Sequence, residues 1–261
     1  MKRNIDPARN TQQIETFVKK TLRNTYKKQV VIAVSGGLDS AVCLTLLVRS
    51  LGSKNITPVL LPYYDQDMSH AWLIIDWNKI DKKQVVEINI GQPVAELARI
   101  QNISSSPQTK QDEIRLGNMM TRVRMILIFD LAKKLDALVC GTENKSEKYL
   151  GYFTRFGDEA SDLEPIQHLY KTQVRALAQH LRLPAIFLDK PPSAGLWTDQ
   201  TDEEELGFSY DTADLVLEQL IDEQKKQGNV VVKGIDQVKV RQVIERVRSQ
   251  EFKRQVPYKI R

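Results

Sequence analysis

One six-residue stretch, Ser-Gly-Gly-Leu-Asp-Ser at positions 35–40, limits what this chain can fold into more than any other feature. An apolar run precedes it and a helical pattern follows it, so the order is strand, tight turn and helix start. Two glycines allow a sharp turn and a close approach of the backbone to a ligand. The unpaired N–H groups and partial positive charge of a helix start then favour an anion such as phosphate.

The spacing of this loop differs from that of two common phosphate-binding loops. It has neither the Gly-x-x-x-x-Gly-Lys-Ser/Thr pattern of a Walker loop nor the Gly-x-Gly-x-x-Gly pattern of a dinucleotide-binding turn. Without a lysine, Ser35, Ser40 and the loop N–H groups would hold one pyrophosphate, while Asp39 would hold a metal ion. The alternative is an ordinary strand-to-helix turn in which Ser or Asp only caps the helix.

Strand and helix patterns alternate along much of the chain. This alternation predicts an α/β fold in which a parallel, twisted sheet is flanked by helices on both faces. Because ligands of such sheets bind at the carboxyl ends of strands, the loops after the first and fourth strands should face one crevice. Strands are expected at residues 29–34, 56–61, 85–90, 137–140 and 185–188. Helices are expected from residue 7, at 40–51, 68–77, 93–100, 112–135 and 171–181, from residue 202, and at 210–224 and 236–250.

Residues 149–168 have neither a helical nor a strand period. Loops of this kind are usually functional or mobile, so we expect residues 153–163 and 225–232 to be mobile without ligand. The whole chain, 1–261, is expected to form a single domain that ends in a basic segment at 233–261. The sequence has no apolar run of ~18 residues that predicts a membrane span, and its start lacks the apolar core of a secretory signal.

The distribution of charge and cysteine narrows the environment and the partners. Cys43 and Cys140 lie in apolar stretches, which indicates buried thiols in a reducing cytoplasm. The net charge is +5, but from Lys225 to Arg261 eleven lysines and arginines stand against three acids. This tail would suit nucleic acid or another polyanion, and equally a solvated helix. No histidine has a zinc-ligand spacing.

A second set of polar side chains follows the fourth expected strand. Residues 143–147, Glu-Asn-Lys-Ser-Glu, would bring a carboxylate across the crevice toward Asp39. Two carboxylates with phosphate oxygens and water make the usual magnesium site, whereas the alternative is a solvated helix start. In the long helix at 112–135, Arg122 and Arg124 point to different faces. One of the two would bind phosphate or carboxylate while the other makes a structural ion pair.

Together these stretches resemble NAD⁺ synthetases, which are ATP pyrophosphatases of the adenine-nucleotide α-hydrolase-like, Rossmann-like fold. The loop at 35–40 is similar to the pyrophosphate-binding loop of that superfamily. Further matches follow in the family's order and extend the resemblance over residues 30–257. They are Gly-Asn at 117–118 with Arg-Val-Arg-Met at 122–125, Gly-Thr at 141–142 through Gly-Asp at 157–158, Lys-Pro-Pro-Ser-Ala at 190–194 with Asp-Glu at 202–203, and Lys-Arg-Gln-Val-Pro at 253–257.

The resemblance implies an ammonia-dependent NAD⁺ synthetase that works in two steps. ATP adenylates the nicotinate carboxylate of deamido-NAD⁺ and releases pyrophosphate, and ammonia then displaces AMP to give NAD⁺. Mg²⁺ is the implied cofactor, and no protein nucleophile is expected. The chain is too short for an added glutaminase domain, so the nitrogen would come from free ammonia or from a separate protein. A homodimer is also implied, with the long helix at 112–135 as its candidate contact. Neither a membrane nor a nucleic acid is an expected partner.

The same resemblance assigns residues to each ligand. Asp39 and Glu147 would hold magnesium, and Asp39 and Lys171 would act electrostatically in catalysis. The expected ATP-binding residues are Ser35, Gly36, Gly37, Asp39, Ser40, Thr142, Lys171 and Ser193. The expected residues for deamido-NAD⁺ are Arg122, Arg155, Asp162, Phe252 and Lys253.

Three departures from the family pattern concern the acid substrate. The family usually reads Gly-Asp-Gly-Gly where this chain has Glu159 and Ala160 in place of the last two glycines. Arg155 stands where lysine is common, and Phe252 where many members have histidine. These changes predict weaker or altered acid binding with an intact ATP half. Two other interpretations stay open: a tRNA-modifying ligase with a related loop, whose basic tail would bind RNA, and a non-catalytic nucleotide-binding protein.

Overall fold

The computed structural model describes residues 5–104, 107–197, 200–255 and 257–260. Its centre is a sheet of parallel strands in the order β3–β2–β1–β4. The strands are β1 Gln29–Ala33, β2 Ile56–Leu60, β3 Val86–Glu87 and β4 Ala137–Cys140. In register, Val31 of β1 lies opposite Thr57 on one side and Val139 on the other. The predicted parallel α/β class is confirmed.

Eleven α-helices connect and cover these strands in the described part of the chain. Several begin at caps that the sequence provides: Asp6 accepts the Arg9 N–H, and Thr109 accepts the Asp112 N–H. No helix among the described residues is long and apolar enough to cross a membrane. The helices are α1 Pro7–Asn24, α2 Leu38–Leu51, α3 Ser69–Trp77, α4 Gly91–Ile100, α5 Lys110–Leu135, α6 Lys145–Leu150, α7 Lys171–His180, α8 Ile186–Asp189, α9 Asp202–Leu206, α10 Tyr210–Leu217 and α11 Gln237–Ser249.

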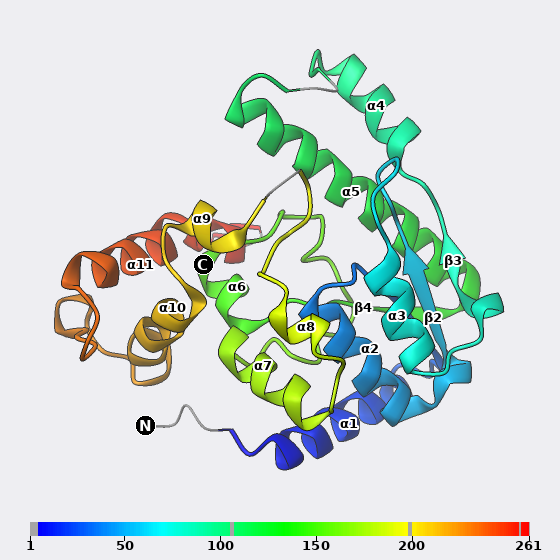
Figure 1. Cartoon of the computed structure of the whole chain (residues 1–261), viewed down its shortest axis with the longest axis horizontal. Coiled ribbons are helices and arrows are strands. Elements are labelled where there is room, and N and C mark those ends of the chain that lie inside the picture. The colour runs from blue at the N-terminus through cyan, green and yellow to red at the C-terminus, as the bar shows by residue number, and fades with distance from the viewer. Residues whose placement is uncertain (1–4, 105–106, 198–199, 256, 261) are drawn as a thin grey trace.

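Helices cover both faces of the sheet (Figure 1). Successive residues of a strand point to opposite faces, so Val30 and Ile32 of β1 pack with α1, α2, α3, α7 and α8. Val31 packs instead with α4 and α5. All three side chains are fully buried. A strand covered on both faces is apolar throughout, which explains why its sequence shows no polar alternation.

The C-terminal helices form a third core beside the sheet. Apolar side chains of α10 and α11 pack around Leu150 of α6 and Tyr170, which precedes α7. Figure 1 shows α9, α10 and α11 at the side of the molecule away from β3. Asp236 caps α11, so this basic helix begins where the sequence predicts it. The third core is connected to the rest of the molecule through α6 and α7, against which α10 packs.

The strand predicted at 185–188 is wrong, because these residues form the helical turn α8. Ala185 has φ −54° and ψ −32°, and the Leu188 N–H donates to its carbonyl at 2.8 Å. A four-residue apolar run does not separate a buried strand from a buried helical turn. The side chain of Phe187 is 2% exposed, and either structure would bury it.

Two other predicted elements are shorter in the structure. β3 covers Val86–Glu87 rather than 85–90, although the Ile88 N–H still donates to the Leu60 carbonyl at 2.9 Å. Helix α10 ends at Leu217, and a π-helical turn over the next five residues replaces the predicted continuation to 224. Such turns commonly interrupt α-helices without ending the helical path.

Candidate functional site

The loop between β1 and α2 is shaped to hold an anion. Gly36 has φ +75°, and a side chain there would meet the backbone nitrogen of Ala71 at 2.9 Å. Glycine alone satisfies both the conformation and the close approach. The Ser35 hydroxyl lies 3.1 Å from that of Ser40 and accepts the Gly37 N–H at 3.3 Å. Helix α2 has no side-chain cap, so its first N–H groups can donate to a ligand.

An ion-pair centre lies close to this loop. The Lys171 ammonium pairs with Asp39 Oδ2 and lies 3.1 Å from Glu147 Oε1. Asn144 links the two acids, because its amide donates to Asp39 Oδ1 at 3.2 Å and it forms a capping box with Glu147. The structure thus brings Asp39 together with a carboxylate that follows β4, as the sequence predicts.

Burial dominates the electrostatics of this centre. It raises the pKa of Glu147 to about 8, even though the Lys171 charge opposes the shift. Burial alone would lower the pKa of Lys171, but the charges of Asp39, Glu147 and Asp202 outweigh it and raise that pKa. The lysine side chain is 8% exposed. It is therefore a buried ammonium held by carboxylates.

Asp214 of α10 fixes the backbone that carries Lys171 and Glu147. Its carboxylate accepts the Ser146 hydroxyl, and it accepts the N–H and hydroxyl of Thr172 at 2.9 and 2.8 Å. The Ser146 hydroxyl in turn accepts the Lys171 N–H at 2.8 Å. Both Ser146 and Asp214 are buried. This network ties the starts of α6 and α7 to the C-terminal helices.

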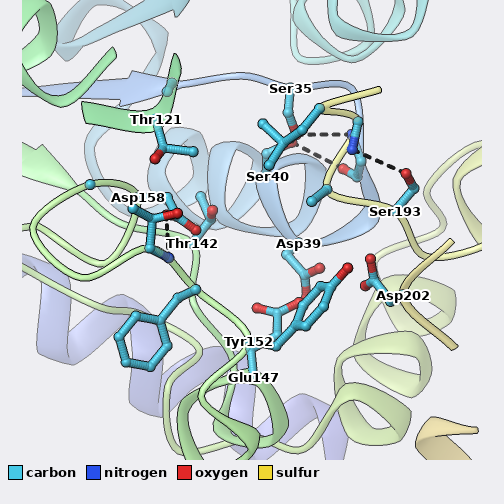
Figure 2. A pocket seen from close by; sticks show the side chains of 18 of the residues that line it. Ser35, Asp39, Ser40, Thr121, Thr142, Glu147, Tyr152, Asp158, Ser193 and Asp202 are labelled. Carbon is cyan, nitrogen blue, oxygen red and sulfur yellow. Dashed lines mark hydrogen bonds between the residues drawn. The ribbon is translucent and has the colours of Figure 1, made fainter. Parts of the chain in front are cut away.

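A cavity of about 610 Å³ is bounded by the loop, the ion-pair centre and residues 190–197. Its volume suits a nucleotide, since small-ligand pockets measure roughly 300–1,000 Å³. Figure 2 shows Ser35 and Ser40 at one side of the pocket, with Asp39, Glu147 and Asp202 gathered beside the Tyr152 ring. The lining includes most of the residues predicted to hold ATP or metal, namely Ser35, Gly37, Asp39, Ser40, Thr142, Glu147, Lys171 and Ser193. Gly36 does not line the cavity.

Lys253 lines the cavity from the C-terminal segment. Its ammonium donates to the carbonyls of Gly151 at 2.6 Å and Phe153 at 2.7 Å. Burial, with a contribution from the Arg246 charge, lowers the pKa of Lys253 to about 8. In this structure the lysine therefore fixes the loop that follows α6.

The other residues predicted to bind deamido-NAD⁺ lie outside the cavity. Arg122 is exposed and donates to the Arg155 carbonyl at 3.2 Å. The Arg155 guanidinium lies 6.0 Å from the Phe252 ring, which is 45% exposed. Asp162 accepts the Val139 N–H at 2.7 Å. These groups form an open edge rather than an enclosed site.

Several cavity residues were not assigned from the sequence. Arg124 lines the cavity and donates to the Leu61 carbonyl at 3.0 Å, while Arg122 points to solvent, so the two arginines do diverge. Tyr152 and Asp202 also line it. In the sequence Asp202 looks like the acidic start of a helix. Only the resemblance of Asp-Glu at 202–203 to the NAD⁺ synthetase pattern indicated that Asp202 could belong to the site.

Known proteins are similar to this sequence over most of its length. The NAD synthase family matches residues 10–257. An NH(3)-dependent NAD(+) synthetase of Chlorobium phaeovibrioides is 39% identical over 258 residues, covering 95% of this chain and 88% of that protein. The NH(3)-dependent NAD(+) synthetase of Thermococcus kodakarensis is 37% identical over 262 residues, covering 98% of each.

Solved structures share the fold over nearly their full length. An NMN synthetase from Francisella tularensis has a TM-score of 0.82 at 29% identity, covering 98% of this chain and 99% of that one. An NH3-dependent NAD synthetase from Campylobacter jejuni has a TM-score of 0.80 at 27% identity, covering 99% and 100%. The shared fold, the glycine loop and the sequence match agree: this chain belongs to the NAD synthase family.

Proposed function

We propose that this chain is an ammonia-dependent NAD⁺ synthetase that amidates deamido-NAD⁺ at the expense of ATP. The observation that carries the proposal is that one cavity is lined by the glycine loop, which includes Asp39, and by Glu147 and Lys171. A site of this kind combines phosphate donors with a pair of metal-binding acids. Family membership and the named relatives support the same reaction.

The ATP phosphates bind at the N-terminal end of α2. Ser35, Gly37 and Ser40 supply hydroxyl and N–H donors there, and Lys171 supplies an ammonium from another wall of the cavity. Thr142 lines the same space and contacts the nucleotide, as does Ser193 of the 190–197 segment. Donors fixed in advance stabilise the charge that develops on departing pyrophosphate, which lowers the barrier to adenylation.

The acid pair fits a magnesium ion. Asp39 and Glu147 already hold a cation between them, the Lys171 ammonium. Among the described residues no group of three or more His, Cys, Asp or Glu is arranged to hold a metal. Two protein carboxylates would then be completed by phosphate oxygens and water, a ligand set that Mg²⁺ accepts. When bound, Mg²⁺ would neutralise pyrophosphate charge and align the phosphates.

No protein nucleophile takes part in this scheme. The nicotinate carboxylate attacks the α-phosphorus of ATP, forming a C–O–P link as the bond to pyrophosphate breaks. Ammonia then forms a C–N bond at the activated carbonyl and loses a proton to solvent, and AMP leaves with the electrons of the C–O bond. Apolar side chains such as Val59, Ile128 and Leu196 line the cavity and limit hydrolysis of the acyl-adenylate by water.

Deamido-NAD⁺ binds at the open edge of the cavity. Arg122, Arg155 and Lys253 offer positive charge toward the two phosphates of the dinucleotide. The exposed ring of Phe252 offers a stacking surface, and Asp162 offers an acceptor. We place the enzyme in the cytoplasm, since Cys43 and Cys140 are free thiols. Nucleic acid is not a partner in this proposal.

Residues 153–163, several of which line the cavity, are proposed to close over the bound substrates. Residues 225–232 do not line the cavity and are proposed only to become ordered at the same time. Residues 153–163 and 225–232 have little regular structure, apart from a short 3-10 turn at Gln227–Asn229. Loops over a site commonly order when ligand binds. Hydrogen exchange with and without an ATP analogue plus deamido-NAD⁺ tests this, because both stretches should become protected. Equal exchange in the two states would contradict loop closure.

A homodimer built on α4 and α5 is the proposed assembly. Ile100 of α4 is 56% exposed and Ile126 of α5 is 59% exposed, whereas Ile114 of α5 lines the cavity. Because α4 and α5 pack together and carry exposed apolar side chains, we take these two helices as the contact. A second copy would also cover residues near the open substrate edge. Light scattering should give a dimer for the parent and a monomer for Ile126→Glu, and a monomeric parent would overturn the assembly.

A second candidate substrate is the mononucleotide acid, nicotinate mononucleotide. The observation that favours it is the NMN synthetase structure, which matches with a TM-score of 0.82. Of the departures from the family pattern, Phe252 lies at the open edge, which would hold the second nucleotide, whereas Ala160 lines the cavity. The chemistry at the carboxylate is the same for both acids, so only the open edge would distinguish them.

One turnover assay separates these functions. The enzyme is given ATP, Mg²⁺ and ammonium with either deamido-NAD⁺ or nicotinate mononucleotide, and AMP and pyrophosphate are measured. We expect the dinucleotide to be used with a kcat/KM at least roughly tenfold higher. Preference for the mononucleotide would support the second candidate. ATP binding without turnover of either acid would indicate a nucleotide-binding protein, and tRNA-dependent AMP release would indicate a tRNA-modifying ligase.

A further inference from the structure

Asp202 is buried against the cavity with one carboxylate oxygen unpaired. The residue is 3% exposed and lines the cavity. Its Oδ2 accepts the Tyr210 hydroxyl at 3.0 Å, whereas Oδ1 has no hydrogen-bond partner among the described residues. The Tyr152 hydroxyl also faces Asp202, but it donates to Glu205 at 2.6 Å. A buried carboxylate oxygen without a donor is destabilising, so a cation that reaches Asp202 Oδ1 would be stabilised there.

The Lys171 ammonium is placed to become that cation. It lies 5.2 Å from the centroid of the Tyr210 ring, and the hydroxyl of the same ring donates to Asp202. The Asp202 charge already acts on Lys171, although the lysine forms its ion pairs with Asp39 and Glu147. Lysine carries its charge on a flexible four-carbon stem, so the ammonium can change partners without a backbone movement.

Lys171 occupies the place that the proposed function gives to magnesium, and the inference rests on that part of it. A divalent cation between Asp39 and Glu147 would repel the ammonium from both carboxylates. A buried ammonium that loses its partners is strongly destabilising. Metal binding therefore depends on where the lysine charge can go.

We propose that Asp202 is the second counter-ion of Lys171. The ammonium lies between Asp39 and Glu147 in the empty enzyme. It moves to Asp202 Oδ1 when a divalent cation enters before ATP, and it contacts the ATP phosphates once these are bound. Asp202 is then a positioning residue that favours metal binding by accepting the displaced lysine. It is not itself a ligand, which agrees with the absence of a three-residue metal cluster among the described residues.

Binding of Mn²⁺ alone tests the proposal without any substrate. Free Mn²⁺ is measured by its electron paramagnetic resonance signal in the presence of the full-length protein. Asp202→Asn should weaken Mn²⁺ binding roughly tenfold, a usual size for coupling between two sites. Lys171→Met should tighten it, because the competing cation is gone. The double variant should bind as Lys171→Met does. Glu204→Gln, an exposed acid on the same short helix, should change the affinity by less than about twofold.

The outcomes distinguish each part of the argument. If Asp202→Asn weakens binding equally in the Lys171→Met background, Asp202 acts on the metal directly and the proposal is wrong. No change in the parent background also overturns it. If Asp39→Asn binds Mn²⁺ as tightly as the parent, the metal site of the proposed function is itself wrong. Should the double variant not fold, the ¹⁵N signal of the Lys171 ammonium decides, because Mg²⁺ should shift it to a different value in Asp202→Asn, where the displaced ammonium has no second carboxylate, and at roughly tenfold higher Mg²⁺.

Discussion

The ATP half and the acid-substrate half of this site differ in how far they are assembled without ligand. In the ATP half, Lys171 is 8% exposed at its side chain, is ion-paired, and has its backbone fixed through Ser146 and Asp214. In the other half, Phe252 is 45% exposed and Arg155 stacks on it from an open loop. Asp39 and Glu147 are held together by the Lys171 charge and by hydrogen bonds to fixed backbone, so the ATP half is largely built in advance. Changes there should act on rate, and changes at the open edge on substrate affinity.

The largest effect is expected in the ATP half. Asp39→Asn keeps the shape of the side chain but removes its charge, so turnover should fall ~10²-fold or more. Pyrophosphate release at saturating Mg²⁺ measures this, beside a thermal melt that should show a folded protein. Asp76→Asn, an exposed acid of α3, is the matched control. If pyrophosphate release by Asp39→Asn is unchanged, Asp39 is not a metal ligand. The expected difference between rate effects in the ATP half and affinity effects at the open edge would then also be wrong.

Lys253→Ala, at the cavity wall next to Phe252 of the open edge, should change affinity rather than rate. One charge-assisted contact to a phosphate is worth about 1–3 kcal/mol, so the KM for deamido-NAD⁺ should rise roughly 5- to 100-fold while that for ATP stays nearly constant. Lys259→Ala, an exposed lysine of the same basic tail, should change neither. Salt-sensitive tRNA binding at micromolar protein, with normal kinetics for Lys253→Ala, would reassign the tail to nucleic acid.

A smaller effect is expected from restoring the family's residue at position 252. Phe252→His adds a hydrogen-bonding group at the edge, and one such bond is worth about 0.5–1.5 kcal/mol. The KM for deamido-NAD⁺ should therefore fall by roughly 2- to 10-fold. Phe156→His, the other exposed ring beside Arg155, serves as the control. A rise in KM for the dinucleotide, with better use of the mononucleotide, would favour the second candidate substrate.

The smallest effect concerns stability near the ATP half. Burial, with the charge of Glu164, raises the pKa of Glu143 from 4.5 to about 8. The native state keeps a proton that the unfolded state has lost, so stability falls as pH rises from about 4.5 through 8. Glu143→Gln cannot ionise, and its melting temperature should fall about 2–4 °C less between pH 5 and pH 8. Glu87→Gln on exposed β3 is the control. If the melting temperatures of the parent and of Glu143→Gln fall equally with pH, ionisation of Glu143 does not destabilise the protein.

The sequence predicts the ATP half better than the open edge for a physical reason. The loop at 35–40 and the acids after β4 sit at fixed places in a parallel sheet, so their meeting follows from topology. Asp202 and Asp214 reach the site only through the packing of the C-terminal helices, which no local period reveals. The turn α8 was misassigned because four apolar residues are compatible with either a strand or a helix.

The Asp214 network also sets an order of events during synthesis. Lys171 and Glu147 leave the ribosome before α10, yet the Ser146 hydroxyl and the Thr172 N–H are tied to a carboxylate of that later helix. A domain generally folds as a unit. A nascent chain that lacks α10 therefore carries the glycine loop but lacks the carboxylate that fixes the lysine. The chain can therefore catalyse adenylation only once α10 is present. A stalled or truncated product would lack this helix.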